Sequence, residues 1–271
     1  MGSWNGMTYE GKDTLLRVVR HEAEDFYALA ERPGVWEAPT GCAEWQVRDL
    51  VGHLVDVTEN YFERFDAARG GLEVEPAYGV RGMAERAGER GRSFRDVPQA
   101  ELVERGRTDF AKMMGLLEAL TPEDWTGLNV PHYYVGRLPA HFYAAFQLMD
   151  YGVHTWDIRE GSGREHALSG EVADLLVPYM FVLWSATAAP APEAAPFEIG
   201  IRITGGANAG DTRVSVGPDG LSYAAGDIAD LTVLELDAGS FVLTAFGRCH
   251  GGTVRGDREV ADRFLNLFFR I

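Results

Sequence analysis

The feature that most constrains the fold is a helical spacing of apolar residues through the first two-thirds of the 271-residue chain. In 12–31 and 44–68 apolar side chains return every three or four positions, as one face of an amphipathic helix requires. The same spacing predicts helices over 98–120, 138–160 and 170–188. We therefore expect an antiparallel bundle of four or five long helices.

The segments between these helices are less regular. The polar, glycine-rich stretch 71–96 is expected to form a loop with a short helix at 83–91. The stretch 126–136 reads as a loop, and its apolar residues indicate that it packs against the protein. We expect both segments to connect helices of the bundle.

A second pattern begins after an alanine- and proline-rich linker at 188–196. Apolar residues alternate in 197–204, as in a strand with one buried face. Further strands are expected at 212–216, 221–224, 231–236 and 252–255, and helices at 238–246 and 258–269. The sequence thus predicts a mainly α domain over 1–188 and a small α+β domain over 197–271.

The composition of the chain limits the classes of partner that it can bind. The chain has 41 acidic and 25 basic residues, a formal charge of −16, and no basic stripe of the kind that nucleic-acid binding needs. It has no apolar run of about 18 residues and no basic-then-apolar start, so we expect neither a membrane span nor a secretory signal. Cys42 and Cys249 are too few for a disulfide framework, and neither belongs to a Cys-x-x-Cys pair. A cytoplasmic protein without nucleic-acid or membrane partners is predicted.

Three residues stand out as candidate metal ligands. Asp150 and His154 are four positions apart on one helix, so their side chains lie on the same face, one turn apart. His53 lies near the apolar side of its own helix, where an imidazole without a partner is costly. Asp49 and Asp157, about one turn from the two histidines, are candidates to accept the second ring N–H of each.

Two imidazoles and one carboxylate suit zinc and also admit nickel, iron or manganese. Three protein ligands would leave a position for water or a thiolate, as catalytic sites do. Spacing alone favours two other interpretations over a metal site. An aspartate and a histidine one turn apart often lie on a solvated helix face, and a lone inward histidine is often a hydrogen-bonded core residue.

Two segments resemble the signatures of a known family. The stretch 45–54 (WQVRDLVGHL) and the stretch 150–157 (DYGVHTWD) are similar to those of the mycothiol-dependent maleylpyruvate isomerase family, within the wider DinB-like group of four-helix-bundle metalloproteins. Residues 244–248 and 252–257 resemble the end of its small α+β domain, which is similar to sterol-carrier folds. The resemblance implies His53, Asp150 and His154 as ligands of a divalent metal, usually zinc. The member that names the family has Glu in place of Asp150, so here the carboxylate reaches one methylene less far.

The resemblance also implies a reaction. Mycothiol, a low-molecular-weight thiol, would act as nucleophile on a small electrophilic substrate, for isomerisation or S-transfer. Arg248 is the nearest match to the family's substrate-facing arginine; a cation that caps a helix is the other interpretation. A metal-dependent hydrolase and a non-catalytic small-molecule binding protein remain as alternatives. The sequence does not identify the substrate or the oligomeric state.

Overall fold

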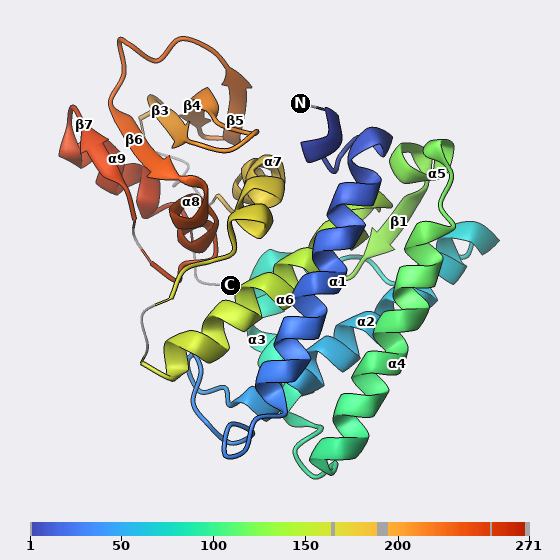
Figure 1. Ribbon diagram of the computed structural model, residues 1–271. Helices are drawn as coiled ribbons and strands as arrows, with labels where there is room; N and C mark the ends of the chain where they lie inside the picture. The colour runs from blue at the N-terminus through green and yellow to red at the C-terminus, as the bar shows by residue number, and fades with distance from the viewer. Residues whose placement is uncertain (1, 164–165, 189–194, 250, 269–271) are drawn as a thin grey trace. The chain divides into compact units, whose positions relative to one another are not determined.

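The structure is a computed structural model that describes residues 2–163, 166–188, 195–249 and 251–268. The chain divides into two compact units, one formed chiefly by Gly6–Leu168 and the other by Ser169–Ile271 with a few residues near the N-terminus. The first is helical and the second combines helices with a sheet (Figure 1). The predicted combination of a helical N-terminal part and an α+β C-terminal part is confirmed.

In the first unit four long helices pack together (Figure 1). The segments that connect them along the chain include two shorter helices and a hairpin. The long helices are α1 (Lys12–Ala30), α2 (Val47–Gly70), α4 (Gln99–Glu118) and α6 (His141–Gly161). The shorter ones are α3 (Val80–Arg92) and α5 (Pro122–Gly127). Two single turns of 3-10 helix, Gly2–Trp4 and Tyr9–Gly11, precede α1. The predicted spacing therefore placed each long helix to within a few residues.

Both ends of α2 follow from local sequence. At its start the backbone N–H of Gln46 donates to the Asp49 carboxylate at 2.9 Å, which satisfies a group that the first helical turn leaves unpaired. At its end Gly71 adopts a left-handed conformation with φ of 63°, and the N–H of Leu72 donates to the Ala67 carbonyl at 2.9 Å. That arrangement closes the last turn, and a glycine adopts it without strain.

The expectation of an irregular loop at 126–136 was wrong. Thr121 and Asp124 cap the short helix α5, which opens with Pro122. An antiparallel hairpin follows, made of β1 (Asn129–His132) and β2 (Gly136–Pro139). Each strand has only four residues, too short for an alternating pattern to stand out. Because β2 takes up Leu138 and Pro139, α6 begins three residues later than predicted.

Helix α3 packs very closely on the turn of α2 that precedes His53. A Cβ atom at Gly91 would lie 2.8 Å from the Asp49 carbonyl oxygen and 3.4 Å from the His53 Cβ, and one at Gly52 would meet the Gly91 carbonyl. Heavy atoms of this kind do not approach so closely, so the two backbones can touch here only through glycines. This contact with α3 holds the turn of α2 that carries His53 in place.

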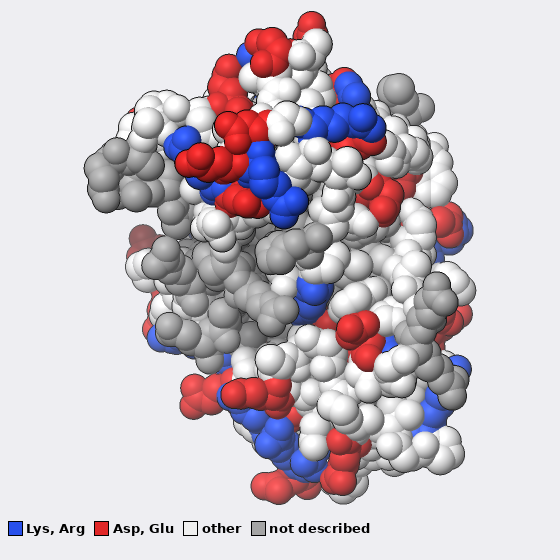
Figure 2. Space-filling model, turned by 90° about the vertical axis from the view of Figure 1, so that its left-hand side faces the viewer, with Lys and Arg blue, Asp and Glu red and all other residues white. Residues whose placement is uncertain are grey.

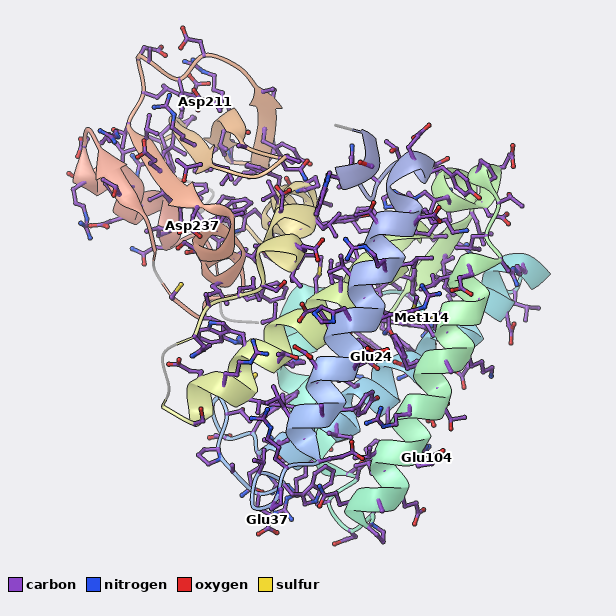
Figure 3. The ribbon with its side chains drawn as sticks, in the orientation of Figure 1. Glu24, Glu37, Glu104, Met114, Asp211 and Asp237 are labelled. Atoms are coloured by element: carbon purple, nitrogen blue, oxygen red, sulfur yellow. The ribbon has the colours of Figure 1, made fainter. Side chains whose placement is uncertain are left out.

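The second unit is built on a five-stranded sheet with the order β5-β4-β3-β6-β7. Its strands are β3 (Phe197–Thr204), β4 (Gly210–Gly217), β5 (Gly220–Ala225), β6 (Val233–Asp237) and β7 (Thr253–Arg255). Only β3 and β6 are parallel; the other neighbours are antiparallel. Helices α8 (Ala238–Ala245) and α9 (Arg258–Leu265) complete the predicted elements, and Asp237 caps the start of α8 (Figure 3).

Helix α7 (Gly170–Thr187) belongs to the same compact unit as the sheet. Its Trp184 ring lies edge-on to Phe241 of α8 and Phe264 of α9, with centroids 4.7 and 5.0 Å away. The Asp174 carboxylate accepts the backbone N–H groups of Ala207 and Asn208 at 2.9 Å each. The expected boundary at 188–197 stays a prediction, and most of the expected linker, 189–194, lies outside the described residues.

The surface agrees with the acidic composition. Figure 2 shows acidic and basic side chains interspersed over one face, with no continuous basic area among the described residues of that face. Within the part of the chain that the structure describes, no helix is long and apolar enough to cross a membrane.

Candidate metal centre

Helices α2 and α6 run antiparallel and bring the three predicted ligands together. His53 Nε2 lies 3.7 Å from Asp150 Oδ1, and the His53 and His154 rings meet edge to face with centroids 5.4 Å apart. One donor atom from each of the three side chains lies within 4.8 Å of the other two. Zinc–nitrogen and zinc–oxygen bonds are about 2.0–2.2 Å, so the three atoms would have to move inward by only about 1 Å to share one ion.

Two atoms of this group are buried without a hydrogen-bond partner among the residues that the structure describes: Nδ1 of His53 and Oδ2 of Asp150. A buried polar atom without a partner costs on the order of 1–3 kcal/mol. The free Asp150 oxygen could ligate a cation bound by the group, whereas His53 faces Asp150 through Nε2 and not through Nδ1. The residue types, their separation and the unused Asp150 oxygen therefore fit a divalent metal.

A second carboxylate orients His154. Asp157 is fully buried, and its Oδ2 lies 2.8 Å from His154 Nδ1. The carboxylate accepts the Nδ1–H, which leaves Nε2 of the ring as the donor atom for an ion. Burial lowers the pKa of His154, although the hydrogen bond and charge of Asp157 oppose that shift. His154 is thus held as a neutral imidazole, the form that binds metals.

The other expected orienting residue is engaged elsewhere. Asp49 accepts two hydrogen bonds from Arg95, both at 2.7 Å, in addition to the N–H of Gln46. Burial favours its neutral form, but these contacts more than offset burial and lower the pKa of Asp49. The expectation that Asp49 orients His53 was therefore wrong, because the capping position turns its carboxylate toward the start of α2.

The loop before α2 contributes two residues that sequence reasoning did not place at the site. Cys42 Sγ donates to Asp157 Oδ2 at 3.2 Å and lies 4.0 Å from His154 Nδ1, so Cys42, His154 and Asp157 form a second group with metal-ligand spacing. The Trp45 ring packs against both histidines, with centroids 5.3 Å from His53 and 6.1 Å from His154. A lone cysteine gives no sequence signal for this contact.

This loop is fixed to α6 by contacts of its backbone. The N–H of Gly41 donates to the Asp157 carbonyl at 2.8 Å. A Cβ at Gly41 would lie 2.6 Å from Asp157 Oδ1, and one at Gly161 would overlap the Pro39 carbonyl group. The loop therefore approaches α6 closely enough that only glycine fits at these two positions.

His132, at the end of β1, is a third histidine close to the group. It lies against Phe146 of α6 with centroids 4.8 Å apart, and the Tyr134 N–H donates to its Nδ1 at 3.3 Å. Burial lowers its pKa to about 4; the charge of Asp150 opposes the shift and that of Arg64 adds to it. His132 is therefore neutral near pH 7 with its proton on Nε2.

Arg248 lies in the second unit, just after α8. Its backbone N–H donates to the Leu243 carbonyl at 2.8 Å, and its Nη1 donates to the Phe246 carbonyl at 3.2 Å. These contacts are those of a cation at a helix C-terminus. Its assignment as a substrate-binding residue stays a prediction.

The fold and the site together define a helical domain with a candidate metal centre, in which two neighbouring helices contribute two imidazoles and a carboxylate. Residues 19–159, more than half of the chain, match the family model described as "Mycothiol maleylpyruvate isomerase N-terminal domain". The chain belongs to this family, which confirms the resemblance of its two signature segments. The family is named after an enzyme, so membership of the family confirms the prediction that the chain is an enzyme.

Solved structures agree on the fold. The crystal structure of the mycothiol-dependent maleylpyruvate isomerase superposes with a TM-score of 0.55 and 13% identity, covering 90% of this chain and 91% of that one. A histidine-to-alanine mutant of that enzyme gives the same TM-score and coverage with 12% identity. The colibactin self-resistance protein ClbS, in complex with double-stranded DNA, has a TM-score of 0.48, too low to carry an argument. No match was found among curated protein sequences.

Proposed function

We propose that the chain is a metal-dependent enzyme that uses mycothiol as the nucleophile for isomerisation or S-transfer on a small electrophilic substrate. His53, Asp150 and His154 would hold the metal, with zinc as the first candidate and nickel, iron or manganese as alternatives. A cytoplasmic setting, where small thiols stay reduced, accompanies this proposal. The observation that carries it is the convergence of the three donor side chains from α2 and α6, together with an Asp150 oxygen that is buried without a hydrogen-bond partner among the described residues.

A divalent ion at these residues would stabilise the thiolate form of a bound thiol near neutral pH. Asp157 and Trp45, which contact the proposed ligands, have separate tasks. Asp157 holds the His154 ring in the tautomer that turns Nε2 toward His53 and Asp150. Trp45 covers both imidazoles and limits the rotation of their rings. Arg248 is proposed to hold a substrate carboxylate by a two-pronged contact.

Maleylpyruvate is the first substrate to test, because the solved relatives are named for it. Metal analysis of protein purified without chelators should find about one divalent ion per chain. His53→Ala and His154→Ala should lose that ion, whereas His21→Ala, at an exposed position of α1, should keep it. Retention of the ion in both site variants would refute the assigned ligands, and so would native protein without metal that is as stable as protein supplied with it.

The reaction separates the enzyme classes. Chromatography of maleylpyruvate incubated with metal-loaded protein should show an isomerised product or a thiol adduct only when mycothiol is present. Cleavage of maleylpyruvate by water without mycothiol would favour a hydrolase, since a metal can also activate water. Bound metal with neither product would favour the binding-protein alternative.

A further inference from the structure

Arg64, on α2, is a buried cation for which the described residues supply no carboxylate partner. Its side chain is only 6% exposed, and its Nε is buried without a hydrogen-bond partner. No carboxylate among the described residues forms an ion pair with it, although Asp49, also buried on α2, is paired with Arg95. Burial of a charge without a partner is expensive, so such a group is a candidate to meet an external anion.

The aromatic ring of Tyr133 fixes the guanidinium. Arg64 Cζ lies 3.4 Å from the Tyr133 ring centre, and the Tyr133 hydroxyl donates to Asn60 Oδ1 at 3.1 Å. An arginine packed on a ring keeps its N–H groups at the edges, in the plane that a carboxylate needs for a two-pronged contact. Asn60 lies one turn before Arg64, so the contact holds the guanidinium beside the turn nearer to His53.

Helix geometry places Arg64 on the same side of α2 as His53. The two residues are eleven positions apart, close to three full turns, so their side chains lie on one face with Cα atoms about 16 Å apart. Long helical side chains lean toward the N-terminus, which leaves a span of roughly 10–14 Å between the guanidinium and the metal ligands. A small organic molecule can cover that distance.

Further polar groups lie along this span. Gln147 of α6 is fully buried; its Nε2 donates to Thr58 of α2 at 3.3 Å, and its Oε1 has no partner within the described part of the chain. His132 lies close enough to both ends that the charges of Asp150 and Arg64 both act on it. Gln147 and Thr58 thus close the α2–α6 interface itself, whereas Val57 and Asn60, on the same face of α2 as His53 and Arg64, are only half-buried.

We propose that Arg64 binds a carboxylate at the far end of the small molecule whose reacting end lies at His53, Asp150 and His154. The position of the reacting end rests on the proposed function. The carboxylate subsite rests on the burial, the stacking and the unused capacity of Arg64. It would give the first unit its own substrate-selecting cation, in addition to the role proposed for Arg248.

A series of thiols that differ in length tests the span. Protein loaded with Co²⁺ is titrated with mercaptopropionate, mercaptohexanoate, mercaptooctanoate and mercaptoundecanoate, each beside the matching hydroxyl-terminated thiol, and the sulfur-to-cobalt absorption band reports binding. The carboxylate should improve affinity about 10- to 100-fold at the chain length that reaches Arg64, the gain expected for a hydrogen bond to a charged group. The shortest thiol should show no such gain.

Variants assign that gain to a residue. Arg64→Met keeps the length of the side chain and should abolish the gain while leaving the affinity for the hydroxyl-terminated thiols unchanged. Arg64→Lys, which keeps the charge without the two-pronged edge, should retain part of it and serves if Arg64→Met does not fold. Arg69→Met, at an exposed position of α2, is the control and should behave as wild type. A gain that persists in Arg64→Met, or that disappears only in Arg248→Met, would overturn the proposal.

A titration without metal separates the subsite from the proposed function. Hexanoate added to chelator-treated protein should bind in calorimetry, more weakly at high salt, and Arg64→Met should reduce its affinity at least tenfold. If no thiol binds the Co²⁺ protein but hexanoate still depends on Arg64, the proposed function fails and the subsite stands. If hexanoate does not bind, or binds Arg64→Met equally well, the subsite is refuted.

Discussion

Replacement of Asp157 by Asn tests how the candidate centre is organised. The two side chains have nearly the same shape, so the change removes the charge from a fully buried position without opening a cavity. The weakened interaction is the 2.8 Å contact with His154 Nδ1, because a neutral amide oxygen would replace the charged acceptor of a hydrogen bond worth about 1.5–3 kcal/mol. We therefore expect Asp157→Asn to weaken metal binding about 10- to 100-fold, as loss of such orienting carboxylates typically does.

Competition with a chromogenic chelator measures that change. Cys42→Ala should weaken metal binding less than Asp157→Asn, because a thiol is a weak donor to the same carboxylate. Asp174→Asn is the matched control, since Asp174 is also a buried aspartate but accepts backbone N–H groups in the other unit. It should lower stability without changing metal affinity. If Asp157→Asn binds metal within twofold of wild type, the orienting role of Asp157 is refuted.

Three further outcomes follow from packing and burial. Gly161→Ala should destabilise the fold by several kcal/mol because its Cβ would overlap the Pro39 carbonyl. Gly115→Ala, with open space around it on α4, should instead stabilise the fold by up to ~1 kcal/mol. Denaturant titration measures both changes, and equal effects would refute the close approach of Gly161 to Pro39. Lys12→Met should destabilise by about 1–3 kcal/mol in the same titration, because Lys12 Nζ donates to two carbonyls at the end of α4, at 2.7 and 2.6 Å; an unchanged midpoint would contradict this. Burial lowers the pKa of His141 from 6.5 to about 4. As pH falls, the unfolded chain therefore binds the proton before the folded protein does. The stability that neutral His141 contributes is complete above pH 6.5 and is lost as pH falls toward 4. His141→Gln should reduce that loss by up to ~3 kcal/mol across the window, and an identical pH profile of unfolding would refute it.

The sequence predicted the parts of the fold that depend on one helix face. The spacing of apolar residues located each long helix, because burial of one face imposes it. The same periodicity placed Asp150 and His154 on one face, and the structure brings His53 to them. It also offered Asp49 and Asp157 equally as orienting residues. Only the three-dimensional contacts distinguish them, since Asp49 is taken up by Arg95 and Asp157 is not.

Features that depend on packing between distant segments had no sequence signal. The spacing in α7 shows a buried helix but not which unit buries it. The hairpin of β1 and β2 is too short to show a period. Cys42 contacts Asp157 although 115 positions of chain separate them. Arg64 stands out because its buried Nε has no hydrogen-bond partner among the described residues, which a sequence cannot show. These features became visible only when neighbouring elements were in place.

The contact between Gly52 and Gly91 bears on how this chain can vary. Neither glycine carries a functional group, yet any side chain at either position would push α3 away from the turn that presents His53. In a library that contains every single substitution, selected only for folded protein, both positions should tolerate almost nothing while exposed neighbours such as Glu89 vary freely. The two glycines would then look as invariant as metal ligands, for reasons that have nothing to do with chemistry.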